Sequence, residues 1–131
     1  MRRNGFETEF EVSIDLNNLK LLGHVDAYNP DISTLIEIKT SNKIPEAPYT
    51  EHLLQTQVYK VLTNSKQSYI IYISRSDGKV RVFKVEDGKG VLKWAIERAK
   101  KLKEALTIAN IPNPERSHLC NYCEFQLNCW R

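Results

Sequence analysis

Residues 21–39 have the sequence L-L-G-H-V-D-A-Y-N-P-D-I-S-T-L-I-E-I-K, which predicts two short strands joined by an N-P-D turn. Side chains alternate between the two faces of a strand, so Glu37 and Lys39 share one side of the second strand. Ile36 and Ile38 point to the other side. We therefore expect the polar face of this strand to be the one available for chemistry.

The polar residues of this stretch suit metal-dependent hydrolysis of phosphodiesters. Asp26 and Glu37 would hold a divalent cation, and Lys39 would face the attacking water or the developing charge on the phosphate. Taken alone the pattern is weak, because short Asp…Glu-x-Lys patterns are common by chance. The alternative is an exposed hairpin whose Glu–Lys pair contributes about a few tenths of a kcal/mol.

The rest of the chain predicts an α/β (α+β) domain with a mixed sheet flanked by helices. Residues 6–16 alternate between apolar and polar side chains, which is typical of a half-buried antiparallel strand. Residues 69–74 form a continuous apolar run, as expected of a central strand covered on both faces. The expected elements are strands 6–16, 19–28 and 33–40, a helix 50–62, strands 69–74 and 79–85, and a helix 90–109.

Composition limits the class of protein. The 131 residues are enough for one domain, and 41% apolar and 27% charged residues are typical of a globular protein in water. The apolar runs are far shorter than the roughly 20 residues of a membrane span. No apolar signal region follows Arg2 and Arg3. We therefore expect a cytoplasmic protein without a membrane segment.

The predicted helices carry further candidates. Gln55 and Tyr59 stand four residues apart and share one face, as site residues or in ordinary packing of the helix on the sheet. Trp94 is next to Ala95 on the apolar side of the last helix, so we expect it in the core. The net charge is only +3, but this helix is rich in basic residues. Lys93, Arg98, Lys100, Lys101 and Lys103 form either a surface for phosphates or a solvated face.

Three motifs together resemble the PD-(D/E)XK nuclease superfamily, and specifically its RecB-like branch. They are G-H-V-D at 23–26, E-I-K at 37–39 and Q-T-Q-V-Y at 55–59, in the order of the family. The tail C-N-Y-C-E-F-Q-L-N-C at 120–129 resembles the iron–sulfur exonucleases of CRISPR adaptation modules, Cas four, and their viral relatives. The resemblance implies a restriction-endonuclease-like core over residues 1–112 and a cysteine-rich metal-binding tail over 113–131, packed on the core.

The resemblance also implies roles for individual residues. Asp26 and Glu37 would be ligands of Mg²⁺ or Mn²⁺, together with the backbone carbonyl of Ile38. A water on the metal would attack the phosphorus, and Lys39 would orient that water or neutralise charge in the transition state. Gln55 and Tyr59 would help to position the site and the DNA strand.

The three cysteines of the tail are predicted to bind a metal. An odd, tightly clustered set in a chain without a secretion signal favours metal over disulfides. The iron–sulfur relatives use a fourth cysteine upstream of the core, which has no counterpart here. Three outcomes therefore stay open for Cys120, Cys123 and Cys129: an iron–sulfur cluster with another fourth ligand, a zinc site closed by His118, or free thiols.

One further departure from the family concerns the start of the core. Relatives often supply a metal-binding histidine or glutamate from a helix before the first strand. This sequence instead begins almost directly in a strand. His24 shares the face of Asp26 and is either a further metal ligand or an exposed strand histidine. Glu9 and Glu11 are ambiguous in the same way, with a solvated strand face as the simpler interpretation.

The function implied by the resemblance is that of a single-stranded DNA exonuclease dependent on Mg²⁺ or Mn²⁺. One alternative is a structure-selective endonuclease similar to junction resolvases, which share the Asp…Glu-x-Lys core. Another is a poorly catalytic subunit that binds DNA or protein. The implied partners are DNA, preferably single-stranded, and CRISPR adaptation proteins. A homo-oligomer is a further possibility, because a small chain that lacks a helix can complete itself by self-association.

Overall fold

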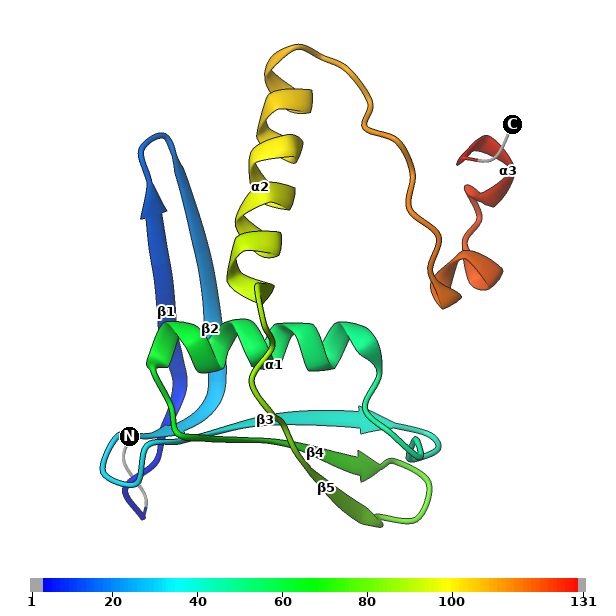
Figure 1. The fold of residues 1–131 in the computed structure, drawn as a ribbon. Coiled ribbons are helices and arrows are strands. Elements are labelled where there is room, and N and C mark those ends of the chain that lie inside the picture. The colour runs from blue at the N-terminus through cyan, green and yellow to red at the C-terminus, as the bar shows by residue number, and fades with distance from the viewer. Residues whose placement is uncertain (1–3, 130–131) are drawn as a thin grey trace.

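The computed structural model describes residues 4–129, which form one sheet, two long helices and an extended tail (Figure 1). The strands are β1 (Glu7–Leu16), β2 (Leu19–Asn29), β3 (Thr34–Ser41), β4 (Gln67–Ser74) and β5 (Val80–Lys84). The helices are α1 (Thr50–Thr63), α2 (Val91–Thr107), the short 3₁₀ helix η1 (His118–Tyr122) and α3 (Gln126–Cys129).

The order of strands in the sheet follows the chain, β1-β2-β3-β4-β5. Neighbouring strands are antiparallel except for β3 and β4, which are parallel. A parallel pair needs a crossover connection, and α1 supplies it. The prediction of an α+β domain with a mixed sheet is therefore confirmed.

The β1–β2 hairpin is long and projects from the rest of the sheet. Leu16 pairs with Leu19 across the turn, where Asn17 has a φ of 47° that asparagine tolerates well. The hairpin points away from β3, β4 and β5, so the sheet divides into two arms, and α1 lies across the place where they part (Figure 1).

The core lies between α1 and the sheet. Val12, Val25 and Leu35 form one buried cluster against which Tyr59 and Leu62 of α1 pack. Ile70, Tyr72 and Val85 form a second cluster, which Ile44, Leu53 and Phe83 border. The alternating pattern of β1 is confirmed, because its buried and half-buried side chains alternate with exposed ones from Phe10 onward.

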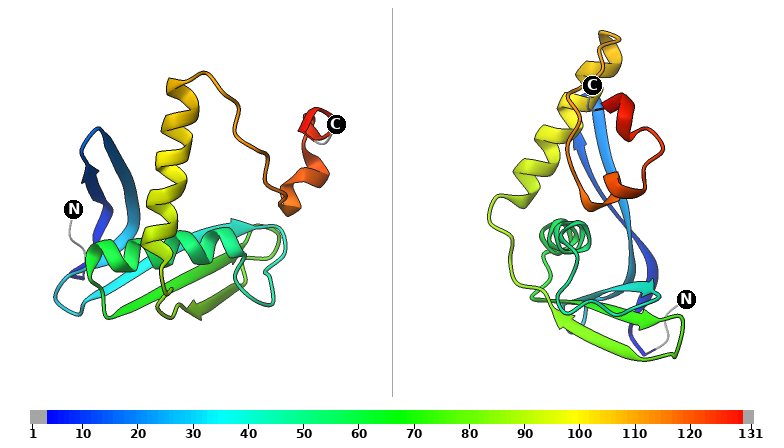
Figure 2. Two further views of the ribbon diagram at one scale, coloured as in Figure 1. Left: turned by 45° about the horizontal axis from the view of Figure 1, so that its top comes forward. Right: turned by 90° about the vertical axis from the view of Figure 1, so that its right-hand side faces the viewer.

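The prediction that β4 is covered on both faces was wrong. Its alternate residues Ser68, Ile70, Tyr72 and Ser74 are buried, whereas the residues between them are only half-buried. The reason is that α1 and α2 lie on the same side of the β3–β5 arm (Figure 2), so one face of β4 has no helix over it in the described part of the chain.

Helix α2 lies beside α1 and the β1–β2 hairpin, but several of its large apolar side chains stay exposed. Trp94 is 42% exposed, so the prediction of a core position was wrong, and Leu102 and Leu106 are exposed as well. The first half of α2 passes beside α1, and its second half runs beside the β1–β2 hairpin (Figure 1), where Lys100 and Ile108 border the same hollow as Leu19. Among residues 4–129, no helix is long and apolar enough to cross a membrane.

After α2 the chain runs in an extended, exposed segment that returns toward the start of α1. Arg98 of α2 donates a hydrogen bond to the carboxylate of Glu115 in this segment. At the start of η1, the imidazole of His118 stacks on the ring of Tyr49, with 5.8 Å between centroids and 15° between planes. These contacts connect the tail to both long helices.

Candidate functional site

The residues of the sequence motifs meet where β2 and β3 separate. We call this place, formed by Asp26, Glu37, Ile38 and Lys39, the fork. The ladder between β2 and β3 runs from the pair Asn29–Thr34 to the pair Ala27–Ile36 and then stops. Beyond it, Asp26 N–H donates to Glu37 Oε1 at 3.4 Å, and Ile38 N–H donates to Asp26 Oδ2 at 2.7 Å. Two carboxylates thus take the places of backbone carbonyls at the point where the strands separate.

Glu37 and Lys39 face the covered side of β3. The side chain of Glu37 is 2% exposed and that of Lys39 is 20% exposed, with Lys39 Nζ 3.3 Å from Glu37 Oε2. The predicted alternation is confirmed, but the expectation that this face is open was wrong, because α1 covers it. The open face instead carries Ile38, which is 45% exposed.

Helix α1 connects to the fork through a chain of hydrogen bonds. Lys39 Nζ donates to Gln55 Oε1 at 2.7 Å, and Gln55 Nε2 donates to the Tyr59 hydroxyl at 3.2 Å. Tyr59 also packs on β2 at Gly23, where a Cβ atom would lie 2.5 Å from the tyrosine ring. The structure therefore brings Gln55 and Tyr59 to the predicted site, and they pack on the sheet at the same time.

The fork is electrostatically strained. Burial raises the pKa of Glu37 above its usual range, and the neighbouring charge of Asp26 raises it further. The ammonium group of Lys39 and its hydrogen bond act in the opposite direction without cancelling the effect. Two carboxylates beside one lysine make an environment that favours an added cation.

The donor atoms at the fork suit a hard divalent cation. Carboxylate and carbonyl oxygens are the ligands that Mg²⁺ and Mn²⁺ accept, with water completing the coordination. Within residues 4–129, no three side chains of His, Cys, Asp or Glu are grouped as a metal site. Side-chain ligands at the fork are therefore limited to Asp26 and Glu37.

His24 is exposed on the surface of the hairpin. His24 stands opposite Glu11 in the register of β1 and β2, and its Nε2 lies 3.8 Å from Glu11 Oε2. Glu9 is exposed and has a φ of 51°, an uncommon value for glutamate. Pairing with Glu11 is the arrangement expected of an exposed strand histidine, the simpler of the two interpretations.

The residues of the predicted cysteine site lie in the tail: Cys120 in η1, Cys123 directly after it, and Cys129 at the end of α3. Cys120 is partly buried and accepts a hydrogen bond from Ser117 N–H at 3.4 Å, whereas Cys123 and Cys129 are exposed. His118 Nδ1 lies 3.1 Å from Glu51 of α1. The imidazole is therefore engaged with the core, and the metal content of the tail stays a prediction.

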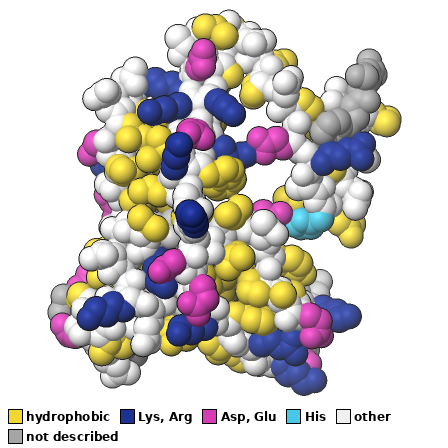
Figure 3. All heavy atoms as spheres, in the orientation of Figure 1, with side chains coloured by type: hydrophobic (Ala, Val, Ile, Leu, Met, Phe, Trp, Pro, Cys, Tyr) yellow, Lys and Arg dark blue, Asp and Glu magenta, His cyan; other side chains and the backbone are white. Residues whose placement is uncertain are grey.

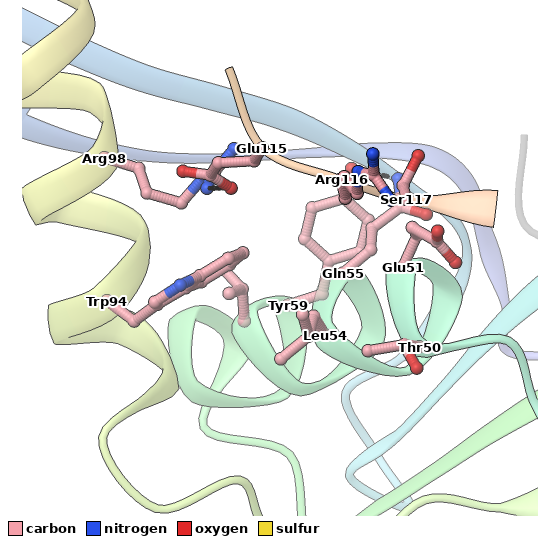
Figure 4. A pocket seen from close by; sticks show the side chains of 11 residues that line it. Thr50, Glu51, Leu54, Gln55, Tyr59, Trp94, Arg98, Glu115, Arg116 and Ser117 are labelled. Atoms are coloured by element: carbon pink, nitrogen blue, oxygen red, sulfur yellow. Dashed lines mark hydrogen bonds and ion pairs between the residues drawn. The ribbon is translucent and has the colours of Figure 1, made fainter. Parts of the chain in front are cut away.

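Two features near the site were missed by the sequence analysis. The first is a tie between α1 and β4, where His52 Nδ1 lies 2.7 Å from the buried Tyr72 hydroxyl. Burial and the charge of Lys39 lower the pKa of His52, which favours the neutral ring. The second is a cavity that Gln55 and Tyr59 share with Trp94 and Arg98 (Figure 4). The only available signal for it was the four-residue spacing of Trp94 and Arg98 in α2.

No family model matches the chain, and no curated protein matches it significantly. The crystal structure of SSO0001 is similar with a TM-score of 0.68 at 25% identity, over 95% of this chain and 60% of that one. A phage-related exonuclease from Haemophilus somnus 129PT is similar with a TM-score of 0.56 at 16% identity, over 80% of this chain and 63% of that one. The chain thus spans less than two thirds of the length of either protein. The second likeness is one of fold.

Proposed function

We propose that the chain is a metal-dependent deoxyribonuclease of the RecB-like PD-(D/E)XK kind. The observation that carries this proposal is the fork, where Asp26, Glu37 and Lys39 come together and connect to Gln55 and Tyr59. The presence of an exonuclease among proteins of similar fold supports the same class of reaction.

The residues at the fork would hold Mg²⁺ or Mn²⁺ through Asp26, Glu37 and the backbone carbonyl of Ile38. A divalent ion bound there supplies an activated water and stabilises negative charge on the phosphate. Burial raises the pKa of Glu37, and the charge of Asp26 raises it further; a bound cation would relieve the repulsion between the two carboxylates.

Lys39 is prepared for its role before any substrate binds. Its ammonium group has three hydrogens, and the carboxylate of Glu37 and the amide oxygen of Gln55 are within reach of two of them. The third is available to the attacking water or to a phosphate oxygen. Because the group is held in place, it stabilises the transition state without first paying for reorientation. Gln55 and Tyr59 act as positioning residues.

The proposed substrate is single-stranded DNA, degraded from an end. This is the substrate implied by the resemblance to the exonucleases of CRISPR adaptation modules and to their viral relatives. The exposed Arg98 of α2, which lines the same cavity as Gln55 and Tyr59, supports a polyanionic substrate. Proteins of a CRISPR adaptation module and a second copy of the chain are the proposed partners.

Digestion of an end-labelled single strand in the presence of Mn²⁺ tests this function. We expect Asp26→Asn and Lys39→Ala to reduce the rate at least about a hundredfold, since each removes a group that acts in the transition state. Glu11→Gln, which removes an exposed carboxylate from β1, should leave the rate unchanged. Equal rates for all four proteins would overturn the assignment.

A circular single strand and a four-way junction distinguish the modes of action. An exonuclease leaves the circle intact, whereas an endonuclease opens it and a resolvase prefers the junction. Binding of DNA without cleavage by the folded wild-type protein would instead indicate a binding subunit.

For the tail, we propose that Cys120, Cys123 and Cys129 bind a structural metal, with an iron–sulfur cluster preferred to zinc. Thiolates are good ligands for either, and a bound metal would fold a segment that has little core of its own. Because these side chains are not grouped as a metal site in the structure, binding requires the tail to rearrange. Metal analysis and visible absorption of the purified protein distinguish the two metals.

A further inference from the structure

A cavity of about 590 Å³ lies beside the fork, between α1, α2 and residues 115–117 (Figure 4). Its volume is within the range of sites that bind small molecules. Gln55 and Tyr59 belong both to its wall and to the hydrogen-bonded chain that starts at Lys39. The cavity is therefore connected to the carboxylates through Gln55 and Lys39.

The lining combines a flat aromatic surface with a cation. Trp94 is 42% exposed, and the guanidinium carbon of Arg98 lies 5.1 Å from the centre of its ring. Leu54 and Val58 of α1 make the wall apolar near the indole. Proteins that bind single strands use aromatic rings to stack bases and nearby cations to hold the backbone.

Charge around the cavity is compatible with a phosphate. Glu115 accepts a hydrogen bond from Arg98, and Glu51 contacts His118, so both acids of the lining have a partner that can carry positive charge. Lys and Arg side chains gather along α2 on the face shown in Figure 3. Of these residues Arg98 lines the cavity, whereas Lys100 lies on another side of the helix, beside Leu16 and Leu19.

We propose that the cavity binds one nucleobase of single-stranded DNA, stacked on Trp94, with an adjoining phosphate at Arg98. This inference rests on the proposed function, because it makes the cavity the subsite that positions a strand over Asp26 and Glu37. Every base offers a flat face for stacking, so the subsite holds the strand without selecting its sequence.

The test compares a labelled oligo(dT) with the same strand lacking three consecutive bases. Binding is measured by fluorescence anisotropy with EDTA present, so that no cleavage occurs. We expect removal of the bases to weaken binding to the wild-type protein about tenfold. Trp94→Ala should bind oligo(dT) about tenfold more weakly and show no further loss with the base-free strand, whereas Trp94→Phe should resemble wild type.

Charge is tested with a matched pair of variants on the same helix. Arg98→Gln should weaken the binding of both strands by a similar factor, because a phosphate contact does not depend on the base. Lys100→Gln loses the same charge on another side of α2, beside Leu16 and Leu19, and should bind within about twofold of wild type.

Failure of the subsite is distinguishable from failure of the nuclease. If removal of the bases has the same effect in wild type and Trp94→Ala, or if single strands do not bind, the subsite is wrong, whatever the cleavage assay shows. If the penalty disappears in Trp94→Ala while Mn²⁺ supports no cleavage, the subsite stands and the catalytic proposal fails. A Trp130→Phe protein leaves Trp94 as the only tryptophan, and quenching of its fluorescence by oligo(dT) gives an independent measurement.

Discussion

Glu37 is an acidic side chain in a place where the fold favours its protonated form. Its folded-state pKa is raised above the usual 4.5, so the folded chain binds this proton more tightly than the unfolded chain. The resulting contribution to stability is fully present below the unfolded pKa and is lost as pH rises through the folded pKa. Without metal, ionised Glu37 therefore costs stability at neutral pH.

From this we expect Glu37→Gln to unfold at a higher urea concentration than wild type at about pH 7, with the advantage shrinking toward about pH 4. Addition of Mg²⁺ should stabilise the wild-type protein and leave the variant unchanged. Glu11→Gln serves as the exposed control and should show neither effect. A variant less stable than wild type at neutral pH, with an undiminished difference in acid, would contradict this account.

At the level of residues, the sequence was sufficient to predict that Glu37 and Lys39 lie together. It was not sufficient to predict which face of β3 is covered. Strand alternation placed Glu37 and Lys39 together, and this pairing is local. Which side of β3 receives α1 depends on contacts between distant segments, such as Tyr59 on Gly23, and no local pattern encodes it. For that reason the covered face was predicted to be the open one.

Among the elements, the contact of α1 with β2 at Gly23 connects the packing of the helix to the site. Gly23 lets the Tyr59 ring approach the strand, and Tyr59 in turn holds Gln55. We expect Gly23→Ala to lower the free energy of unfolding by about 1–3 kcal/mol, because an added Cβ displaces the ring. Nuclease activity should fall with it, since the bond from Gln55 to Lys39 loses its support.

Urea unfolding and the digestion assay measure the two effects of Gly23→Ala separately. Ser13→Ala, at an exposed position of the adjacent strand, should change stability by no more than about 0.5 kcal/mol. If Gly23→Ala is as stable and active as Ser13→Ala, then Tyr59 is not needed where the structure places it.

The elements differ in how far the sequence predicted them. The first strand of the hairpin was predicted because strict alternation is a local signal. The exposure of Trp94 was not, because the apolar stripe of α2 indicates only that one face prefers burial. How much of that face is buried depends on how the helix packs against α1 and β2, which are distant in the sequence.

On the scale of the whole molecule, the tail is attached by a few contacts between exposed groups. His118 stacks on Tyr49 and lies beside Glu51, and residues 108–117 are exposed throughout. We expect His118→Ala to speed proteolytic cleavage within 108–117 by about fivefold, because loss of a stacked pair increases the detached population. Mass spectrometry of the fragments locates the cut.

Tyr122→Ala is the matched control for the tail, because Tyr122 belongs to the same short helix and is 87% exposed. Its cleavage should proceed at the wild-type rate. Equal acceleration in both variants would mean that the tail is held by something other than the contact of His118 with α1.

The parting of β2 and β3 has a mechanical consequence. Asp26 is fixed to one arm and Glu37 to the other, so the spacing of the two carboxylates is set by the angle between the arms. The site lies at the base of the hairpin of β1 and β2, where the two arms join. A force applied at the tip of the hairpin, around Asn17 and Asn18, changes the geometry of the carboxylate pair from a distance of many residues.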